Sequence, residues 1–277
     1  MIEIIERAEV ERILSEPSSR VPEAAVAAGT TASPMTRFRA DVSRFVNGAE
    51  HEARRARLEA LLDGLDPAAL AAAAAAHARA GTCARDIPVA VLADALGFAR
   101  ADVLPSLVEV VAAAYPTGAA ADPETADAAV TALLEASGAA DPAEQVLRVQ
   151  LLVQAHAATT TLVERALAPA RSRGADAPTR ALLESVLRDD SPVPVTRRLV
   201  PGLLEGGEML VTLHLGGPDR EATAERPARV LAFGAGPRAC PAPHHALAIA
   251  AAIVETIRTD GAERRRDEET SPDADAR

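Results

Sequence analysis

The apolar residues of this chain are mostly small. Alanine supplies much of the 48% hydrophobic content, whereas aromatic residues make up only 2% and tryptophan is absent. Alanine has the highest helix propensity, and a core with few aromatic side chains favours closely packed helices. We therefore expect a mainly α protein with a small β component. A chain of 277 residues is long enough to bury one substantial core.

Composition also opposes several classes of function. All 29 basic residues are arginine, so no lysine can form a Schiff base or bind phosphate in a nucleotide-binding loop. A net charge of -11 opposes nucleic acid or an anionic membrane as the main partner. The first residues lack the positive region of a signal peptide, and no apolar run approaches the roughly 18 residues of a membrane span. These features favour a cytoplasmic protein.

Proline and glycine divide the chain into segments. Residues 1–37 are predicted to form an irregular N-terminal arm, because the Ser- and Pro-rich stretch shows no sustained period. Residues 258–277 are charged and almost free of apolar side chains, which predicts a disordered tail. Residues 38–257 are predicted to form a single domain. Its predicted elements are helices at 48–79 (divided near 66), 86–98, 105–114, 142–168, 178–188 and 243–257, and a strand at 208–215.

One of the two cysteines has a distinctive position. Cys240 ends the glycine-rich run FGAGPRAC and precedes the last predicted helix. Gly234 and Gly236 allow positive φ angles and a close approach of the backbone to a flat ligand, and N–H groups near a helix start can stabilise a thiolate. Iron accepts a thiolate ligand. The alternative is a buried free cysteine in a glycine turn.

The same run resembles the haem-binding signature of the cytochrome P450 superfamily, F-G-x-G-x-R-x-C. The matching residues are Phe233, Gly234, Gly236, Arg238 and Cys240. The resemblance implies a reduced cytochrome P450 fold, in a shortened bacterial-type member, and a haem b cofactor whose iron takes Cys240 as its thiolate ligand. Family members usually have glycine two residues after the cysteine, where this chain has Ala242.

Two further segments resemble family segments that bind the haem propionates. In FVNGAEHEARRARL, His51 and Arg55 lie four residues apart, on one face of a predicted helix. Arg198 matches a later propionate contact, and Arg238 in the signature matches another. The alternative for His51 and Arg55 is an ordinary solvated helix face.

The stretch ALLESVLRDD resembles the family helix that carries a Glu-x-x-Arg pair. Arg188 matches the arginine, but Ser185 stands where the glutamate is expected, and Glu184 is rotated by about 100° around the helix. Arg226 matches the arginine that completes this network in the family. We therefore expect Arg188 and Arg226 to carry poorly compensated charge near the core.

The run AHAATT resembles the centre of the long family helix above the haem, which usually reads Ala-Gly-x-acid-Thr-Thr. Thr159 matches the threonine that takes part in proton delivery, whereas Ala158 replaces the acid and His156 replaces the glycine. The resemblance implies a catalytic role for Thr159. His156 is a candidate proton donor in place of the lost acid, because histidine titrates near neutrality. The alternatives are a helix-capping Thr159 and a simply packed His156.

These features together predict a haem-thiolate oxidoreductase, of monooxygenase or peroxygenase type, that oxidises a small organic molecule in specialised bacterial metabolism. The implied partners are that substrate and either a ferredoxin with its reductase or peroxide. One alternative is a haem-free or catalytically silent homologue that acts as a binding or helper protein for a partner enzyme. The other is an incomplete gene product that does not fold stably. Ser185, His156 and Ala158 favour the helper, and Cys240 opposes it.

Overall fold

The computed structural model describes residues 2–26, 29, 31–100, 102–172, 177–204 and 207–270. The elements follow one another as β1 (Ile2–Ile4), α1 (Arg7–Ser15), α2 (Pro34–Asp41), η1 (Ser43–Phe45), α3 (Gly48–Asp63), α4 (Pro67–Arg79), α5 (Ile87–Ala95), α6 (Leu104–Ala114), α7 (Pro123–Ala136), α8 (Pro142–Ser172), α9 (Thr179–Asp189), β2 (Val195–Leu204), β3 (Gly207–His214), η2 (Gly236–Arg238) and α10 (Pro243–Thr270).

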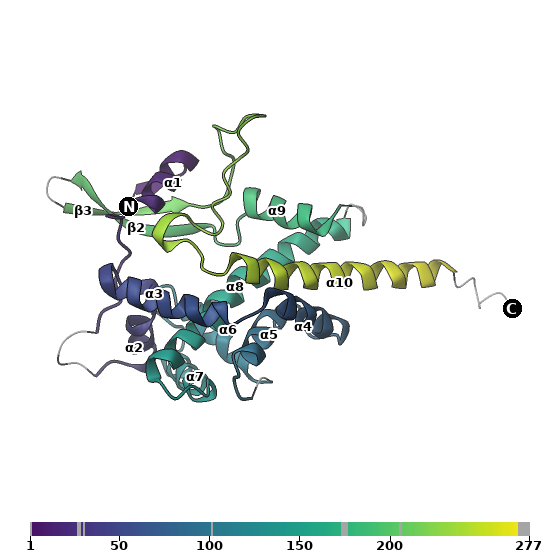
Figure 1. Cartoon of the computed structure of the whole chain (residues 1–277), viewed down its shortest axis with the longest axis horizontal. Helices are drawn as coiled ribbons and strands as arrows, with labels where there is room; N and C mark the ends of the chain where they lie inside the picture. Colours follow the sequence, from purple (N-terminus) through teal and green to yellow (C-terminus); the bar gives the residue numbers. More distant parts are fainter. Residues whose placement is uncertain are drawn as a thin grey trace.

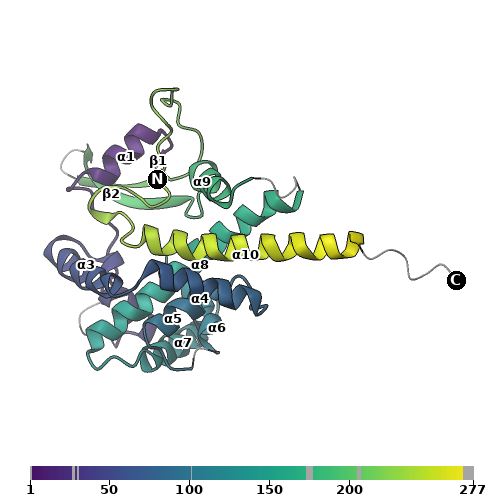
Figure 2. The ribbon, with the colours of Figure 1, turned by 45° about the vertical axis from the view of Figure 1, so that its right-hand side comes forward.

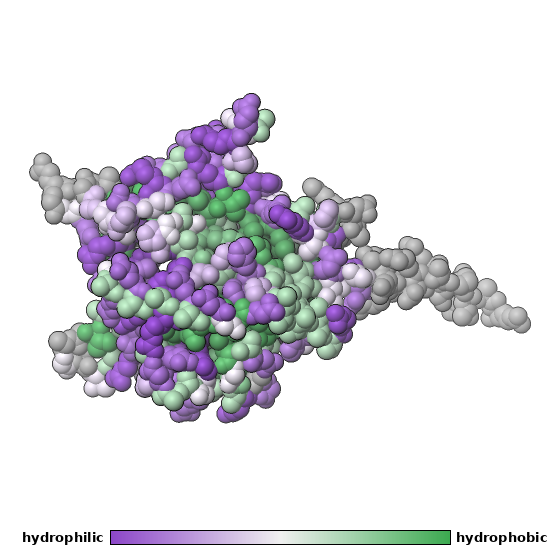
Figure 3. All heavy atoms as spheres, in the orientation of Figure 1, coloured by the Kyte–Doolittle hydropathy of each residue, from purple (hydrophilic) through white to green (hydrophobic). Residues whose placement is uncertain are grey.

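The molecule has a small sheet layer and a larger helical layer (Figure 1). The sheet has the strand order β1-β3-β2, with β1 parallel and β2 antiparallel to β3. α1 lies against the sheet, and the remaining helices surround α8 and α10. A hydrophobic band crosses the middle of one face beside α10, between polar regions above and below (Figure 3). The observed architecture confirms the prediction of a mainly α fold with a small β component.

Small apolar residues allow the helices to approach closely. α4 packs along α10, where Ala74 and Ala250 are both fully buried. α10 also packs on α8, and the largest hydrophobic cluster spans these helices together with α5, α6 and α7. The alanine-rich composition therefore acts as expected, since residues without bulk let helix axes come near each other.

The N-terminal segment differs from the predicted irregular arm. β1 adds a parallel strand to β3, and α1 buries Val10, Ile13 and Leu14 in a cluster with Val211 and Leu213 of the sheet. Apolar residues at this spacing form one face of a helix, and such a face is stable only when it is covered. The irregular part of the arm is the segment between α1 and α2, whose described residues contain no helix or strand.

Further elements differ from the predicted ones, among them α7 and α10. α7 was not predicted, although Pro123 in its first turn and Asp122, whose side chain accepts from the Thr125 amide at 3.1 Å, are ordinary helix-start signals. α10 was predicted to end near residue 257 but continues to Thr270 and projects from the body (Figure 2). The end of this segment is rich in Glu and Arg, which are good helix formers and are also well solvated. Its composition is therefore compatible with a solvated helix as well as with a disordered tail. The rest of the predicted tail lies outside the described residues.

Among the residues described, no helix combines the length and the apolar character that crossing a lipid bilayer requires.

Candidate functional site

The loop before α10, residues 231–240, has the backbone geometry that its glycines predict. We name it the cysteine loop. Gly234 and Gly236 have φ angles of +71° and +65°, a region that residues with a Cβ rarely adopt. The Gly234 amide donates to the Leu231 carbonyl at 2.8 Å, and the Cys240 amide donates to the Phe233 carbonyl at 2.7 Å. The loop therefore folds back on itself and ends with Cys240 three residues before α10 begins.

Gly236 makes its close approach to another part of the chain. A Cβ on Gly236 would lie 2.6 Å from the Cα of Ser15 and 2.7 Å from the carbonyl oxygen of Leu14. The sequence analysis assigned the close approach to a flat ligand, whereas in the structure the loop packs on the end of α1. α1 thus supports the cysteine loop from outside.

The thiol of Cys240 lies in a half-buried position close to one amide and one arginine. The Ala242 amide donates to the Sγ atom at 3.4 Å, so the replacement of glycine by alanine leaves an N–H group directed at the sulfur. Burial raises the pKa of Cys240, and the Ala242 amide and Arg55 oppose that shift. A bound metal cation would favour the thiolate further, because a ligating thiol loses its proton.

α3 contributes the first two predicted propionate contacts. Arg55 donates from Nη1 to the Ala239 carbonyl at 2.7 Å, which joins α3 directly to the residue before Cys240. His51, one turn earlier on the same helix, is buried. The structure therefore places both residues beside the cysteine loop, although they are distant from it in sequence.

Arg238 and Arg198 complete the group from the other side. Arg238 donates from Nη2 to the Val46 carbonyl at 2.5 Å and to Oδ1 of Asn47 at 2.9 Å, just before α3 begins. Arg198 is buried on β2, where its guanidinium donates to the Thr196 hydroxyl at 3.0 Å and the Arg197 carbonyl at 2.9 Å. We name His51, Arg55, Arg198 and Arg238 the cationic cluster.

The charge of the cationic cluster is only partly balanced. Arg55 pairs with Glu59 at 2.6 Å. Within the described part of the chain, neither Arg198 nor Arg238 forms an ion pair with a carboxylate. Burial and then Arg238 lower the pKa of Arg198 to about 10, and burial and then Arg55 lower the pKa of Arg238 to about 10. Burial, followed by Arg238 and Arg55, lowers the pKa of His51 to about 4.

The uncompensated charge that was expected around the Glu-x-x-Arg position is absent among the residues described. Arg188 is exposed and pairs with Asp189 at 2.8 Å, and Arg226 is exposed and pairs with Glu221 at 3.0 Å. Glu184 also faces solvent, where it pairs with an arginine one turn earlier. The prediction that Arg188 and Arg226 carry uncompensated charge near the core is therefore wrong. α9 buries its aliphatic face and turns its charged residues outward.

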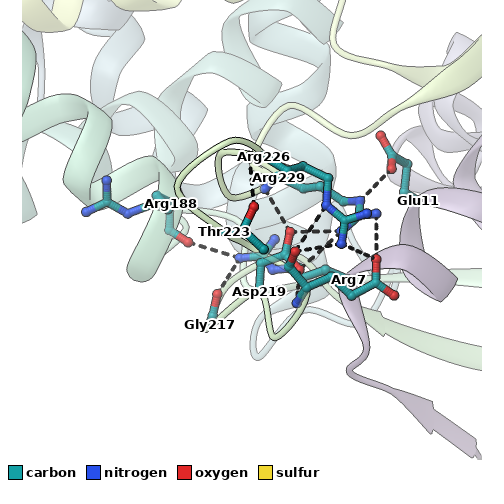
Figure 4. A network of polar contacts seen from close by, with 9 residues as sticks. Arg7, Glu11, Arg188, Gly217, Asp219, Thr223, Arg226 and Arg229 are labelled. Atoms are coloured by element: carbon teal, nitrogen blue, oxygen red, sulfur yellow. Dashed lines mark hydrogen bonds and ion pairs between the residues drawn. The ribbon is translucent and has the colours of Figure 1, made fainter.

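Arg7 of α1 holds this region together instead (Figure 4). Its guanidinium is buried and donates to the carbonyls of Leu215 at 2.7 Å, Gly217 at 2.8 Å and Arg188 at 2.9 Å. The three carbonyls lie beyond the end of β3 and on α9, so one side chain joins α1 to both. Sequence analysis missed Arg7 because its partners are about 200 residues away and α1 itself was not recognised.

A second arginine extends the same network toward the cysteine loop (Figure 4). Arg229 pairs with Asp219 at 3.0 Å, with Glu11 of α1 at 2.9 Å and with Glu221 at 2.9 Å. These carboxylates raise the pKa of Arg229. We name Arg7, Glu11, Asp219, Glu221 and Arg229 the α1 network.

His156 lies on the side of α8 that packs against other helices. It is buried, and its Nδ1 atom has no hydrogen-bond partner among the residues described. Burial lowers the pKa of His156, and Glu109 and Arg85 are the nearest charges that act on it. Thr160, one turn later, donates to the Arg85 carbonyl at 3.1 Å. His156 therefore faces α5 and α6, and its electrostatic neighbours do not include the cationic cluster.

The remaining predicted positions on α8 lie beside a polar chain. Thr159 is buried, and Ala158 is partly exposed. One turn before Ala158, Gln154 accepts from the Gln150 amide at 3.1 Å, and Gln150 donates to the Ser43 hydroxyl at 2.7 Å. This chain joins the middle of α8 to η1, which directly precedes the contacts of Arg238.

A cavity of about 720 Å³ opens elsewhere, between α2, α3, α7 and α8. Its walls include Arg54, Leu134 and Val146, and none of the predicted site residues lines it. Cavity size therefore does not identify the site around Cys240, which is defined by its charges and its thiol.

Comparison with known proteins identifies the class of fold. No protein-family model matches the sequence, and no curated protein matches it. Solved structures do match, and they show that this chain has the cytochrome P450 fold. The predicted resemblance is thereby confirmed at the level of the fold.

Three of these structures illustrate the likeness. The structure of P450BioI in complex with a hexadec-9Z-enoic acid ligated acyl carrier protein matches with a TM-score of 0.70 and 16% identity, over 93% of this chain and 84% of that chain. CalO2 matches with a TM-score of 0.71 and 17% identity, over 92% and 82%. A thermophilic cytochrome P450 from Sulfolobus tokodaii matches with a TM-score of 0.63 and 13% identity, over 92% and 86%.

The residues around Cys240 fit a haem group. Haem offers an iron that accepts a thiolate and two carboxylates that need cations. Cys240 supplies a half-buried sulfur, and Arg198 and Arg238 supply two cations without carboxylate partners in the described structure. The described residues contain no group of three or more His, Cys, Asp or Glu that could hold a metal ion by itself.

Proposed function

We propose that this chain binds one haem b through Cys240 and acts as a haem-thiolate oxidoreductase, of monooxygenase or peroxygenase type, on a small organic molecule. Haem, when bound, supplies the oxidising chemistry with oxygen or peroxide. The protein supplies the sulfur ligand, the cations that hold the carboxylates, and the surroundings of the substrate.

The unbalanced cationic cluster is the observation that carries this proposal. A buried arginine without a carboxylate is costly to fold, because its desolvation is not offset by an opposite charge. Burial lowers the pKa of Arg198 in this way, and it also lowers the pKa of the partly buried Arg238, although Glu23 opposes that shift. Two propionates would restore two charge-assisted pairs beside the residue that ligates iron.

Proton delivery is where this chain departs from the family pattern. Ala158 leaves Thr159 without the acid that the resemblance assigns to the preceding position. A positioned general acid commonly contributes about 100- to 10,000-fold to a rate. We therefore propose that the protein works better with peroxide, or with a substrate that carries its own polar group, than with a ferredoxin and generic substrates. The role of Thr159 is to hold a proton donor near the substrate.

The test is to measure haem binding and its ligand together. Purified protein should contain one haem per chain, and its reduced carbon monoxide adduct should show the red-shifted band of a thiolate ligand. Cys240→Ser should lose that band, because serine offers no thiolate. Cys83→Ser is the matched control, since Cys83 is the other free cysteine and is exposed. It should keep the band unchanged.

The outcomes also separate the alternatives. A thiolate spectrum that persists in Cys240→Ser would show that another residue ligates the iron. A folded protein that takes up no haem would favour the helper-protein alternative, which Ala158 and the exposed Arg188 make possible. Aggregated protein would favour an incomplete gene product.

A further inference from the structure

The cavity of about 720 Å³ lies away from the residues assigned to haem, where α2, α3, α7 and the start of α8 meet (Figure 1). Its walls include the apolar side chains of Leu134, Val146 and Leu147, of which the last two are buried. Cavities that bind small molecules commonly enclose about 300 to 1,000 Å³ and combine an apolar lining with a few polar groups. The volume and the lining therefore suit a small organic molecule with an apolar body.

Two of the arginines in the cavity walls already have partners. The Arg54 guanidinium donates at 2.6 and 2.9 Å to two backbone carbonyls around the end of α2, and it pairs with Glu50 at 2.5 Å. Arg57 pairs with Asp141, which directly precedes α8. The protein itself therefore balances the charges of both arginines.

The hydrogen-bond acceptors in the cavity walls are still available. The Thr131 hydroxyl donates to the Asp127 carbonyl at 3.0 Å, which leaves the lone pairs of its oxygen free. Gln145 donates from Nε2 to the Ala139 carbonyl at 2.7 Å, and no described residue donates to its Oε1 atom. Glu135, one turn after Thr131 on α7, is exposed and forms no ion pair within the described part of the chain. The walls thus offer mainly acceptors to a ligand.

The charge balance of the cavity leaves one carboxylate in excess. Arg37 and Asp41 both line the cavity and are exposed, without ion-pair partners among the residues that the structure describes. They lie one turn apart on α2, so their opposite charges are on the same face of the helix and offset each other. Glu135 has no such counterpart. It lies in the last turn of α7, where the helix dipole is also negative, so this part of the cavity favours a cation.

We propose that this cavity binds an organic ammonium compound with an apolar body, whose charged nitrogen donates to Glu135. An ammonium group carries only donors, which matches the free oxygens of Thr131 and Gln145 as well. Hydrogen bonds between a charged donor and a carboxylate are the strong ones. The apolar body lies against Leu134 and Val146. None of the predicted haem-site residues lines the cavity, so this second site does not depend on haem.

The test compares adamantylmethylamine with adamantylmethanol, which have the same apolar cage and differ in charge at pH 7. Isothermal titration of the purified full-length chain should give one site per chain, and the amine should bind at least about tenfold more tightly than the alcohol. Glu135→Gln should remove that preference and leave the affinity for the alcohol unchanged. Glu135→Asp keeps the charge and should retain most of the preference. Thr131→Trp should weaken both ligands, because the indole would occupy the cavity.

Glu124→Gln is the matched control, because Glu124 is exposed in the first turn of the same helix and does not line the cavity. It should leave both affinities unchanged, and melting temperatures show that each variant is folded. Equal losses of preference in Glu135→Gln and Glu124→Gln would overturn the proposal, because the overall negative charge of the protein would then explain the preference.

Two further results would also overturn the proposal. One is a folded Glu135→Gln protein that still prefers the amine. The other is a change in haem absorbance that follows the titration with amine, because the amine would then be bound at the iron. The expected result is a constant haem spectrum while the amine binds.

Discussion

The α1 network and the cationic cluster surround their arginines with different partners. In the α1 network, Arg229 has three carboxylates, and the guanidinium of Arg7 donates to three carbonyls. In the cationic cluster, the partners of Arg198 among the described residues are a hydroxyl and the carbonyl of its neighbour, and burial and then Arg238 lower its pKa to about 10. The protein itself supplies every carboxylate that pairs with Arg229, whereas Arg7 relies on carbonyls and its pKa is lowered by burial. For Arg198 and Arg238 we propose that the haem propionates supply the anions.

The largest expected effect comes from breaking the α1 network. Arg7→Met should lower the free energy of unfolding by about 3 to 5 kcal/mol, because it leaves three carbonyls without their shared donor. The measurement is urea denaturation. Arg12→Met on the same helix is the control, since Arg12 is exposed with Glu9 as its partner, and its loss should have little effect on stability. Equal effects of the two substitutions would show that Arg7 is not the structural centre of this region.

Gly236 joins the two regions, because the cysteine loop packs there on α1. Gly236→Ala should cost about 3 kcal/mol, since the added Cβ would lie 2.6 Å from a backbone atom of Ser15 at a φ of +65°. Gly234→Ala has a similar φ but no contact closer than 3.6 Å, so it should cost about 1 kcal/mol. Thermal unfolding of both variants measures the difference. If the two variants melt together, the loop does not depend on α1 for support.

The stability of the protein should depend on pH through His51, because burial and the nearby arginines disfavour its charged form. Its pKa is lowered to about 4 in the folded protein, against about 6.5 in an unfolded chain. The unfolded state therefore binds more protons between these values, and stability should fall by about 2 kcal/mol as the pH drops from 6.5 to 4. His51→Gln should remove this part of the slope, measured by urea denaturation of haem-free protein. Bound haem should also reduce this pH dependence, because its propionates would favour the charged form of the His51 imidazole. A slope unaffected by His51→Gln would place the titration elsewhere.

The smallest effect is expected at Ser185. From sequence, Ser185→Glu would be expected to stabilise the protein by restoring a partner for Arg188. In the structure Ser185 and Arg188 are both exposed, and Arg188 already pairs with Asp189. The free energy of unfolding should therefore change by less than about 0.5 kcal/mol. A stabilisation of 2 kcal/mol or more, on the order of a buried ion pair, would mean that α9 turns Arg188 inward.

Local patterns made much of the fold and of the cysteine loop predictable. The positive φ of Gly234 and Gly236 and the positions of α3, α5, α6, α8 and α9 follow from residues close in sequence. The grouping of His51, Arg55, Arg198 and Arg238 was predictable only through the family resemblance, because the group joins α3, β2 and the cysteine loop.

The parts that could not be predicted depend on distant contacts or on competing tendencies. Arg7 is one arginine among many until α1 packs on the sheet, and only then do its three carbonyl partners come within reach. The end of α10 is charged enough for a solvated tail and rich enough in Glu and Arg for a helix.

The most direct test of the central claim is the effect of Arg198→Leu on the free energy of unfolding, measured with and without haem. Without haem, the substitution should stabilise the protein by about 1 kcal/mol, because it removes a buried charge that no carboxylate balances. With haem bound, it should destabilise by about 2 kcal/mol, because a charge-assisted pair is lost. Arg197→Leu, at the exposed neighbouring position, should have little effect in either state. Opposite signs for Arg198→Leu in the two states would support a cluster built for the haem carboxylates, and the same sign in both states would contradict it.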